Sequence, residues 1–353
     1  MGYLQLLSSV RYRKLAALLT LSTCCLVVNI AIFDDNRSVS VYTNVESSWP
    51  GTAESCVPES DWVLCKREDR ELDGALIVNT SALPWTILDR IYPEVEEGGR
   101  WKPKTCHTCD HVAIVIPYRD RDVHLRTYLR HIHPILQRQR LDYGIYVIEQ
   151  DNSSTFNRGI LMNIGFVEAL KYDNYNCFVF SDVDLLPEND RNIYGCPALP
   201  RHLSVSIDTH GYKLFYEELF GGVENFRTEH FRIVNGFSNV YFGWGGEDDD
   251  LYNRIVHRGL RLIRPSVDVA RYTMIRHPSN AISKSGTTTL RTWKLRLSAD
   301  GLNSLVYDVV KYEKRPLYTL ISVVIDQDEV IQNISRNLDK EILLKTLKNF
   351  QFM

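Results

Sequence analysis

Short apolar segments alternate with amphipathic ones between residues 111 and 183, and this alternation restricts the fold more than any other feature of the chain. The apolar segments lie at 111–117, 144–149 and 177–183, and each has the length of a buried strand. Between them, apolar residues recur at helical spacing at 122–139 and 156–170. The order strand, helix, strand, helix, strand predicts an α/β fold with a mostly parallel sheet flanked by helices. Ligand sites in such folds lie at the carboxyl ends of the strands.

Downstream segments make the predicted sheet a mixed one. Short strands are expected at 203–206 and 321–325, and residues 247–257 have the pattern of a helix. The chain has 353 residues, of which 44% are hydrophobic and 24% charged, so it is long and apolar enough to bury a large core. The formal net charge of -3 argues against a dedicated nucleic-acid-binding protein. Nucleic acid is therefore not expected as a partner.

Residues 15–33 carry no charged side chain and approach the roughly 20 residues needed to cross a bilayer. Three basic residues lie just before this run and two aspartates follow it directly. This asymmetry predicts a type II signal anchor with a cytoplasmic N-terminus. A cleaved signal peptide is the alternative, but the run exceeds the about 7–15 residues of a signal-peptide core and no clear A-x-A site follows it. Either way, the rest of the chain is expected on the lumenal or extracellular side.

These patterns divide the chain into four expected parts: a cytoplasmic tail at 1–14, the transmembrane anchor at 15–33, a stem at 34–105 and a lumenal domain at 106–353. The stem is only weakly periodic, which predicts mostly irregular structure with one short ordered piece around Trp85.

The cysteines and sequons agree with an oxidising compartment. Six cysteines lie outside the predicted anchor, an even number that suggests three disulfides: Cys56, Cys65, Cys106, Cys109, Cys177 and Cys196. The pair Cys106 and Cys109 has the spacing of half a zinc site, but no second C-x-x-C or H-x-H motif accompanies it. Four N-glycosylation sequons begin at Asn36, Asn79, Asn152 and Asn333, and the first lies so near the membrane that we expect it to be unmodified.

The strongest local signal for chemistry is the sequence FSDVD, in which an apolar strand runs directly into two carboxylates. Asp182 and Asp184 lie on one side if the extended backbone continues through them. A divalent cation would offset the desolvation cost of two such acids, and oxygen ligands favour Mg²⁺ or Mn²⁺, either of which would also hold a diphosphate. The alternative is an Asx turn followed by a solvated loop. No P-loop, dinucleotide-binding glycine motif or G-x-S-x-G nucleophile motif is present.

A second signal is the sequence WGGEDDD at 244–250. Glycines around Trp244 predict a mobile loop, and four acids follow at the start of the predicted helix. Favourable charge at a helix N-terminus explains some of these acids. One of them acting as a general base is the functional alternative. Further on, Met274 and His277 follow a short strand, which by itself is weak evidence for a site.

Taken in order, several motifs resemble the β1,4-galactosyltransferase family of inverting glycosyltransferases. They are HVAIVIPYRDR, FNRG, FVFSDVDLLP, FGGV, NGFSN, YFGWGGEDDD, MIRH and DGLNSL, and they span about 106–326. The resemblance implies a GT-A-type α/β domain with a single metal, in a type II membrane protein of the Golgi. Residues 106–353 would then be the lumenal catalytic domain.

The resemblance also implies roles for individual residues. Asp184, Met274 and His277 match the metal ligands, a set suited to Mn²⁺ as cofactor. Asp248 matches the catalytic base, Glu247 helps to hold the sugars, and Trp244 closes over donor and acceptor. The residues that match the donor site are Pro117, Tyr118, Arg119, Arg121, Phe156, Arg158, Asp182, Val183, Leu219 and Gly222. Acceptor binding is assigned to Tyr216, Glu218, Trp244 and Asp248.

For the cysteines, the resemblance implies a disulfide between Cys177 and Cys196 and one from Cys106, which we expect to reach Cys56. We infer that Cys65 and Cys109 would then form an additional bridge.

The chain departs from the family at the residue before FGG. Galactose-selective members carry tyrosine there, which crowds the C2 substituent of the donor, whereas this chain has Leu219. The aliphatic residue resembles that of invertebrate N-acetylgalactosaminyltransferases and shifts the expected donor from UDP-Gal to UDP-GalNAc. Thr209 also replaces a family lysine near the donor phosphates, and 278–296 aligns poorly, which bears on the acceptor.

The resulting expectation is transfer of GalNAc to the 4-hydroxyl of terminal β-GlcNAc on glycoprotein or glycolipid. A β1,4-galactosyltransferase and a non-catalytic sugar-binding relative are the alternatives. A paired-carboxylate glycosidase would have no use for a metal triad and a diphosphate site.

Overall fold

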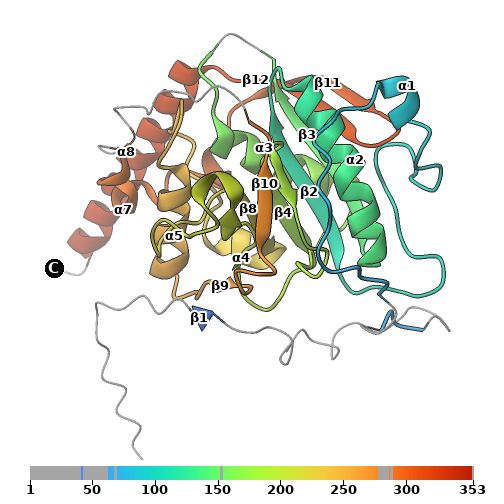
Figure 1. Cartoon of the computed structure of the whole chain (residues 1–353). Coiled ribbons are helices and arrows are strands. Elements are labelled where there is room, and N and C mark those ends of the chain that lie inside the picture. The colour runs from blue at the N-terminus through green and yellow to red at the C-terminus, as the bar shows by residue number, and fades with distance from the viewer. Residues whose placement is uncertain are drawn as a thin grey trace, which may run out of the picture. The chain divides into compact units, whose positions relative to one another are not determined.

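The computed structural model describes residues 41–42, 63–66, 70–151, 154–276, 286 and 289–351. Its main feature is a nine-stranded sheet (Figure 1). In spatial order the strands are β1 (Val41–Tyr42), β9 (Ile263–Arg264), β6 (Arg201–His202), β8 (Val223–Arg227), β4 (Cys177–Ser181), β2 (His111–Tyr118), β3 (Asp142–Gln150), β12 (Thr319–Val324) and β11 (Asp308–Lys314).

The centre of this sheet is parallel, as the alternating sequence predicts. Strand β2 pairs in parallel with both β3 and β4, and β12 pairs in parallel with β3. Strand β8 runs antiparallel to β4 and β6, and β11 runs antiparallel to β12. The prediction of a mixed, mostly parallel α/β sheet is therefore confirmed. The carboxyl ends of β2 and β4 lie at the same edge of the sheet.

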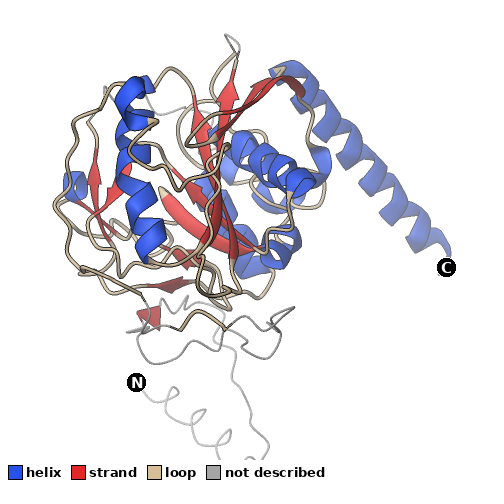
Figure 2. Ribbon diagram, turned by 90° about the vertical axis from the view of Figure 1, so that its right-hand side faces the viewer, coloured by secondary structure: helices blue, strands red, loops and turns tan. Residues whose placement is uncertain are grey.

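Alternation along the central strands divides the core between the two faces of the sheet. In β2, Val112, Ile114 and Ile116 belong to one buried cluster, and Ala113 and Val115 belong to the other. Helix α2 (Asp122–Arg138) packs into the first cluster and α3 (Arg158–Tyr172) into the second. Successive side chains of a strand point to opposite faces, so helices cover both sides of the sheet (Figure 2).

The packing of α3 on the sheet depends on one glycine. A Cβ added at Gly165 would lie 2.3 Å from Cγ1 of Val115. Any larger residue at this position would push α3 away from the sheet. Since α3 begins at Arg158, this close packing also fixes where that arginine sits.

A smaller sheet of three strands, β5 (Leu185–Pro187), β10 (Arg271–Met274) and β7 (Ser206–Ile207), lies beside the first. The prediction of one strand at 203–206 is wrong, because two short strands, β6 and β7, lie on either side of a break at 203–205. The chain leaves the large sheet after β6 and enters the small one at β7, because Leu203 and Ser204 both donate to the carbonyl of Val223. Other helices are α1 (Trp85–Leu88), α4 (Thr228–Ile233), α5 (Glu247–His257), α7 (Trp293–Arg296) and α8 (Gln327–Gln351).

Part of the predicted stem packs with the domain. Leu88 is fully buried, and Trp101 and Tyr143 exchange backbone hydrogen bonds of 3.0 and 2.9 Å. Residues 70–105 are thus part of the same compact unit as the sheet. The short ordered piece predicted around Trp85 is present as α1. Within the described ranges, no helix has the length and apolar character to span a bilayer. The predicted tail and anchor at 1–33 lie outside those ranges.

The disulfides agree with the prediction in one case and correct it in another. Cys177 and Cys196 are bonded, as the resemblance implied. Cys106, however, is bonded to Cys65, so the expected pairings of Cys106 with Cys56 and of Cys65 with Cys109 are wrong. The reason is local: two backbone hydrogen bonds join 63–65 to His107 and bring the Cα atoms of Cys65 and Cys106 to 4.8 Å. Cys109 is also disulfide-bonded, and Cys56 lies outside the described residues.

Candidate active site

Carboxylates from three elements converge on one arginine at the carboxyl end of β4. Arg158 opens α3, where Asn157 caps the helix by accepting from the backbone N–H of Ile160 at 3.0 Å. The Arg158 Nε donates to Oδ1 of Asp182 at 2.6 Å and its Nη2 to Oε1 of Glu224 at 3.3 Å. Its Nη1 lies 3.9 Å from Oε1 of Glu247. One guanidinium thus joins the end of β4, strand β8 and the start of α5.

Burial and crowding raise the pKa values of two of these acids. Burial, partly offset by Arg158, raises the pKa of Glu224 to about 8, and the side chain is fully buried. Burial together with the neighbouring Asp248 raises the pKa of Glu247 to about 7. Removing an acid from water and placing like charges beside it both favour its neutral form. The site therefore holds protons near neutral pH that ordinary carboxyl groups would release.

Three atoms of this cluster are buried and have no hydrogen-bond partner among the described residues: Nη1 of Arg158, Oε2 of Glu224 and Oε2 of Glu247. Buried polar atoms in folded proteins are nearly always satisfied, and exceptions need an explanation. Unsatisfied donors and acceptors at a strand edge are suited to a ligand rich in hydroxyl groups. Glu224 was not among the residues singled out from the sequence.

Two of the predicted metal ligands lie side by side. Strand β10 pairs antiparallel with β5, with Met274 opposite Leu185, and the N–H of Ile275 donates to the carbonyl of Asp184 at 2.8 Å. The third predicted ligand, His277, lies outside the described residues. A carboxylate in the turn before β5 and a thioether on β10 fit Mn²⁺ as a partial donor set. In the described part of the chain, no three His, Cys, Asp or Glu side chains form a metal-binding group.

The backbone at Asp182 is a turn and not an extended strand. Strand β4 ends at Ser181, and the N–H of Leu185 donates to the carbonyl of Asp182 at 3.4 Å. Asp182 thus pairs with Arg158 through its side chain, whereas the backbone carbonyl of Asp184 accepts from Ile275, the residue after Met274. Thr209, at the position of a family lysine, donates from its hydroxyl to the Met274 sulfur at 3.5 Å.

The predicted base, Asp248, lies against the FGG segment. Gly246 precedes α5 with φ 99°, and Asp248 occupies the first turn of the helix. A Cβ added at Gly221 would lie 2.7 Å from Oδ2 of Asp248, so glycine allows this close approach. The next residue of that segment, Gly222, accepts from the N–H of Asp182 at 2.9 Å. The FGG segment thus touches both the arginine cluster and the base.

The predicted acceptor residues form an exposed rim beside the base. Tyr216 donates to Oδ1 of Asp249 at 2.9 Å, and both Tyr216 and Glu218 are exposed. Trp244 is 56% exposed, and the N–H of Gly243 before it donates to the carbonyl of Phe156 at 2.8 Å. An exposed indole next to α5 is available to cover a bound sugar.

The predicted donor residues at the end of β2 meet the segment before α3. The Arg119 guanidinium lies 5.1 Å from the centre of the Phe156 ring and donates to the carbonyl of Ser154 at 2.7 Å. Pro117 is buried within β2, Tyr118 ends that strand, and Arg121 directly precedes α2. Val183 is nearly buried in the turn after β4. This arrangement gives a cationic and aromatic surface at the same edge as the acids.

Leu219 is held by its backbone and is half-buried. Its carbonyl accepts from Nη2 of Arg264 at 2.8 Å, and its N–H donates to the carbonyl of Tyr216 at 3.3 Å. It lies two residues before Gly221, which contacts Asp248. The position predicted to select the donor is therefore two residues from the glycine that lies against the predicted base.

Comparison with known proteins agrees with this arrangement. Residues 65–197 match the model described as the N-terminal region of glycosyl transferase group 7, and residues 201–278 match the one described as the N-terminal domain of galactosyltransferase. Beta-1,4-galactosyltransferase 2 of Cricetulus griseus is 43% identical over 291 residues, which are 81% of this chain and 78% of that protein. Beta-1,4-galactosyltransferase 1 of Mus musculus is 48% identical over 263 residues, which are 73% of this chain and 66% of that protein. The chain thus spans slightly less than two thirds of the mouse protein.

Solved structures give the same result. The catalytic domain of Drosophila β1,4-galactosyltransferase 7 in complex with xylobiose superimposes with a TM-score of 0.55 at 29% identity, covering 62% of this chain and 94% of that one. A mutant of the same enzyme, solved with manganese, UDP-Gal and xylobiose, gives a TM-score of 0.53 at 27% identity with the same coverage. The chain belongs to the β1,4-galactosyltransferase family.

Proposed function

We propose that the protein is a Mn²⁺-dependent inverting glycosyltransferase that moves GalNAc from UDP-GalNAc to the 4-hydroxyl of a terminal β-GlcNAc. The observation that carries this proposal is the convergence of Asp184 with Met274, the Arg158 cluster and Asp248 on one edge of the sheet. A family relative solved with manganese and UDP-Gal supports the metal and the nucleotide. GlcNAc-terminated glycoproteins or glycolipids are the proposed acceptors, and a Golgi membrane is the proposed location.

Each group has a distinct task in this reaction. The Asp248 carboxylate accepts the proton of the acceptor hydroxyl while that oxygen bonds to the anomeric carbon. The bond from the anomeric carbon to the UDP oxygen breaks on the opposite face, so the sugar centre inverts in one displacement. Mn²⁺ held by Asp184, Met274 and His277 would neutralise the charge that develops on the departing diphosphate.

The cationic groups at the donor end divide into two kinds. Arg119 and Arg121, at the end of β2, are placed to stabilise the leaving UDP. Arg158 already donates to Asp182 and Glu224, so its main effect is to fix the carboxylates that receive the sugar hydroxyls. Trp244 covers the bound sugars and excludes water.

The choice of donor rests on Leu219. An aliphatic, half-buried side chain two residues from Gly221 leaves room for an N-acetyl group, which a tyrosine would fill. UDP-Gal is the second candidate, because the relatives at 43–48% identity are named β1,4-galactosyltransferases.

The test compares turnover of UDP-GalNAc and UDP-Gal on a β-GlcNAc acceptor with Mn²⁺, for the wild type, Leu219→Tyr and Leu219→Met. We expect the wild type and Leu219→Met to prefer UDP-GalNAc. Leu219→Tyr should shift the ratio of kcat/KM at least about ten-fold toward UDP-Gal, equivalent to about 1.4 kcal/mol. A wild type that prefers UDP-Gal would reject the donor assignment and leave a galactosyltransferase. Metal-dependent UDP binding without turnover of either donor would point to another acceptor or to a sugar-binding protein.

A further inference from the structure

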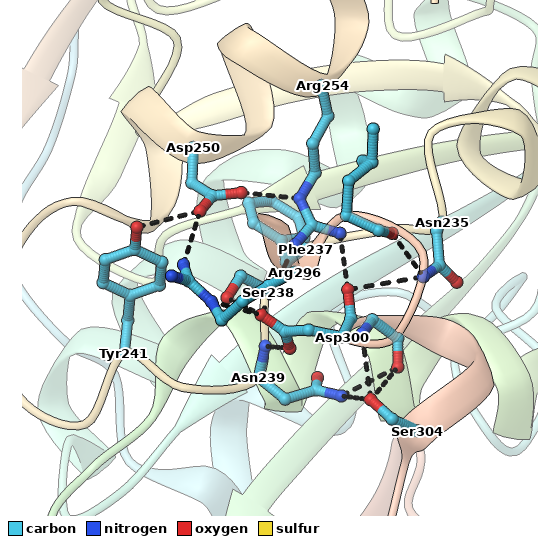
Figure 3. Close-up of polar contacts among 12 residues, drawn as sticks. Asn235, Phe237, Ser238, Asn239, Tyr241, Asp250, Arg254, Arg296, Asp300 and Ser304 are labelled. Carbon is cyan, nitrogen blue, oxygen red and sulfur yellow. Dashed lines mark hydrogen bonds and ion pairs between the residues drawn. The ribbon is translucent and has the colours of Figure 1, made fainter. Parts of the chain in front are cut away.

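Two acids and two arginines form a buried ion cluster (Asp250, Arg254, Arg296 and Asp300), and the first two of these residues belong to α5 (Figure 3). Asp250, Arg254 and Asp300 are completely buried and Arg296 is 9% exposed. Asp250 accepts from Nε of Arg254 at 2.5 Å and from Nη2 of Arg296 at 3.1 Å. Asp300 lies 3.3 Å from Nε of Arg296 and 3.5 Å from Nη2 of Arg254. The four formal charges cancel, and each acid contacts both arginines.

Stability alone does not account for such a cluster. Taking charges out of water costs several kcal/mol per ion, and well-packed apolar replacements are often as stable or more so. What a closed ion cluster provides is a fixed geometry for the segments that it joins. Two of the segments joined here border the candidate site: the start of α5, and Asn239, which accepts from Asn157 beside Arg158 at 2.8 Å.

The cluster holds both ends of the loop that carries Trp244. On the N-terminal side, Oδ1 of Asp300 accepts from the N–H of Asn239 at 2.7 Å, and Tyr241 donates from its hydroxyl to Oδ2 of Asp250 at 2.8 Å. On the C-terminal side, Asp250 is itself in the first turn of α5. The Tyr241–Asp250 hydrogen bond thus closes residues 241–250 into a ring.

The same contact sets the direction of the predicted base. Residues two apart in an α-helix point about 200° apart around its axis. Asp250 points into the buried cluster, and Asp248 points the other way, toward Gly221. A rotation of the first turn of α5 that loosened Asp250 would therefore move the Asp248 carboxylate.

Arg296 adds a second segment to this arrangement. Its Nη1 donates to the carbonyl of Thr289 at 2.9 Å and also to the hydroxyl of Thr292. A Cβ added at Gly286 would lie 2.8 Å from the carbonyl oxygen of Gly245, so the two backbones are in contact. Gly286 consequently contacts the Trp244 loop at Gly245, and Thr289 and Thr292 are linked to it through Arg296 and Asp250.

We propose that Arg296 and Asp250 form a positioning pair for Asp248, in which Arg296 ties Thr289 and Thr292 to the first turn of α5. Neither residue is placed to touch the substrate, and both act through the helix. The proposal rests on the proposed function in taking Asp248 as the base. Loss of the pair should slow the chemical step and leave nucleotide binding intact, because the donor residue Arg119 packs against Ser154 and Phe156, outside the cluster.

The experiment uses the full chain with Mn²⁺ and compares the wild type with Arg296→Met, Arg296→Lys and Lys294→Met. Lys294 is exposed on the same short helix and serves as the matched control. We expect Arg296→Met to lower kcat about ten-fold or more while KM for the donor and the Kd for UDP change less than about two-fold. Arg296→Lys should have a higher kcat than Arg296→Met, since lysine keeps the positive charge but lacks the several N–H donors of the planar guanidinium. Lys294→Met should behave as the wild type.

Two outcomes would overturn the proposal. One is an Arg296→Met protein with a lowered Tm but an unchanged kcat, which would make the pair merely structural. The other is an equal rise in KM and Kd with unchanged kcat, which would place Arg296 in donor binding. If the wild type turns over no UDP-sugar, the proposed function fails. Amide hydrogen exchange then tests whether Arg296 positions the loop and the first turn of α5. Faster exchange confined to 241–250 in Arg296→Met, and absent in Lys294→Met, would support it, whereas unchanged exchange would reject it.

Discussion

Replacement of Glu224 by glutamine is expected to stabilise the protein at pH 8 and to leave its stability near pH 5 unchanged. Burial raises the pKa of Glu224 from 4.5 to about 8 in the folded state, despite the hydrogen bond from Arg158. Between these two values the folded protein keeps a proton that the unfolded chain has released. The free energy of unfolding therefore falls as the pH rises through this range. Glutamine has the shape of a protonated glutamic acid and cannot ionise, so the variant lacks this loss.

The size of the effect follows from the shift in pKa. One proton held only by the folded state changes the free energy of unfolding by at most about 1.4 kcal/mol per pH unit. Between pH 5 and pH 8 the contribution of Glu224 is then on the order of 4 kcal/mol as an upper limit. Glu247, whose pKa is raised to about 7, has the same effect on stability and is still present in the variant. The free energy of unfolding of the variant therefore still falls with rising pH, but less steeply than that of the wild type.

The assay is urea denaturation of the wild type and Glu224→Gln at several pH values from 5 to 8. Glu329→Gln controls for the loss of one carboxylate, since Glu329 is exposed at the start of α8. The two stability curves should meet near pH 5 and separate steadily as the pH rises above it, with Glu224→Gln the more stable. A variant that is less stable than the wild type at pH 8 would show that Glu224 is ionised there and that its pairing with Arg158 dominates. Parallel curves would show that burial does not shift its pKa.

Three further changes test other parts of the site and fold. Gly221→Ala should lower kcat about ten-fold with little change in Tm, because the added methyl would lie 2.7 Å from Oδ2 of Asp248; steady-state kinetics and a thermal melt check this. Asp184→Asn should weaken Mn²⁺ binding at least about ten-fold, or about 1.4 kcal/mol, as measured by calorimetry, and an unchanged affinity would remove Asp184 from the metal site. The double change of Cys65 and Cys106 to serine removes the disulfide that closes a loop of 41 residues. In the chain-entropy model this should lower the free energy of unfolding, measured by urea denaturation, by about 4 kcal/mol. A loss below about 1 kcal/mol would show that the two hydrogen bonds to His107 hold the segment without the disulfide.

The pattern of apolar and charged residues was sufficient to predict strand β2 and helix α5. Strand β2 is apolar on both faces and α5 begins at the first acid of its run, so both agree with their predicted positions. The turn after β4 was not predictable in this way, because the sequence DVD is compatible with an extended strand and with a turn. The pairing of Cys106 was wrong for a similar reason. It depends on two backbone hydrogen bonds between 63–65 and His107, for which cysteine spacing gives no information.

Glu224 shows why part of the site is accessible only through the fold. Its segment, VENFR, mixes charged and apolar residues and lacks the alternation that marks a strand. It becomes strand β8 because it pairs antiparallel with β4, which places Glu224 opposite Phe180 and within 3.3 Å of Arg158. Arg158 in turn reaches this point because Gly165 lets α3 pack closely on β2. The carboxylate therefore acquires its raised pKa from contacts among four elements that are distant in sequence. The motifs single out Asp182 and Glu247, whereas the third acid that contacts the same arginine, Glu224, is brought there by strand pairing.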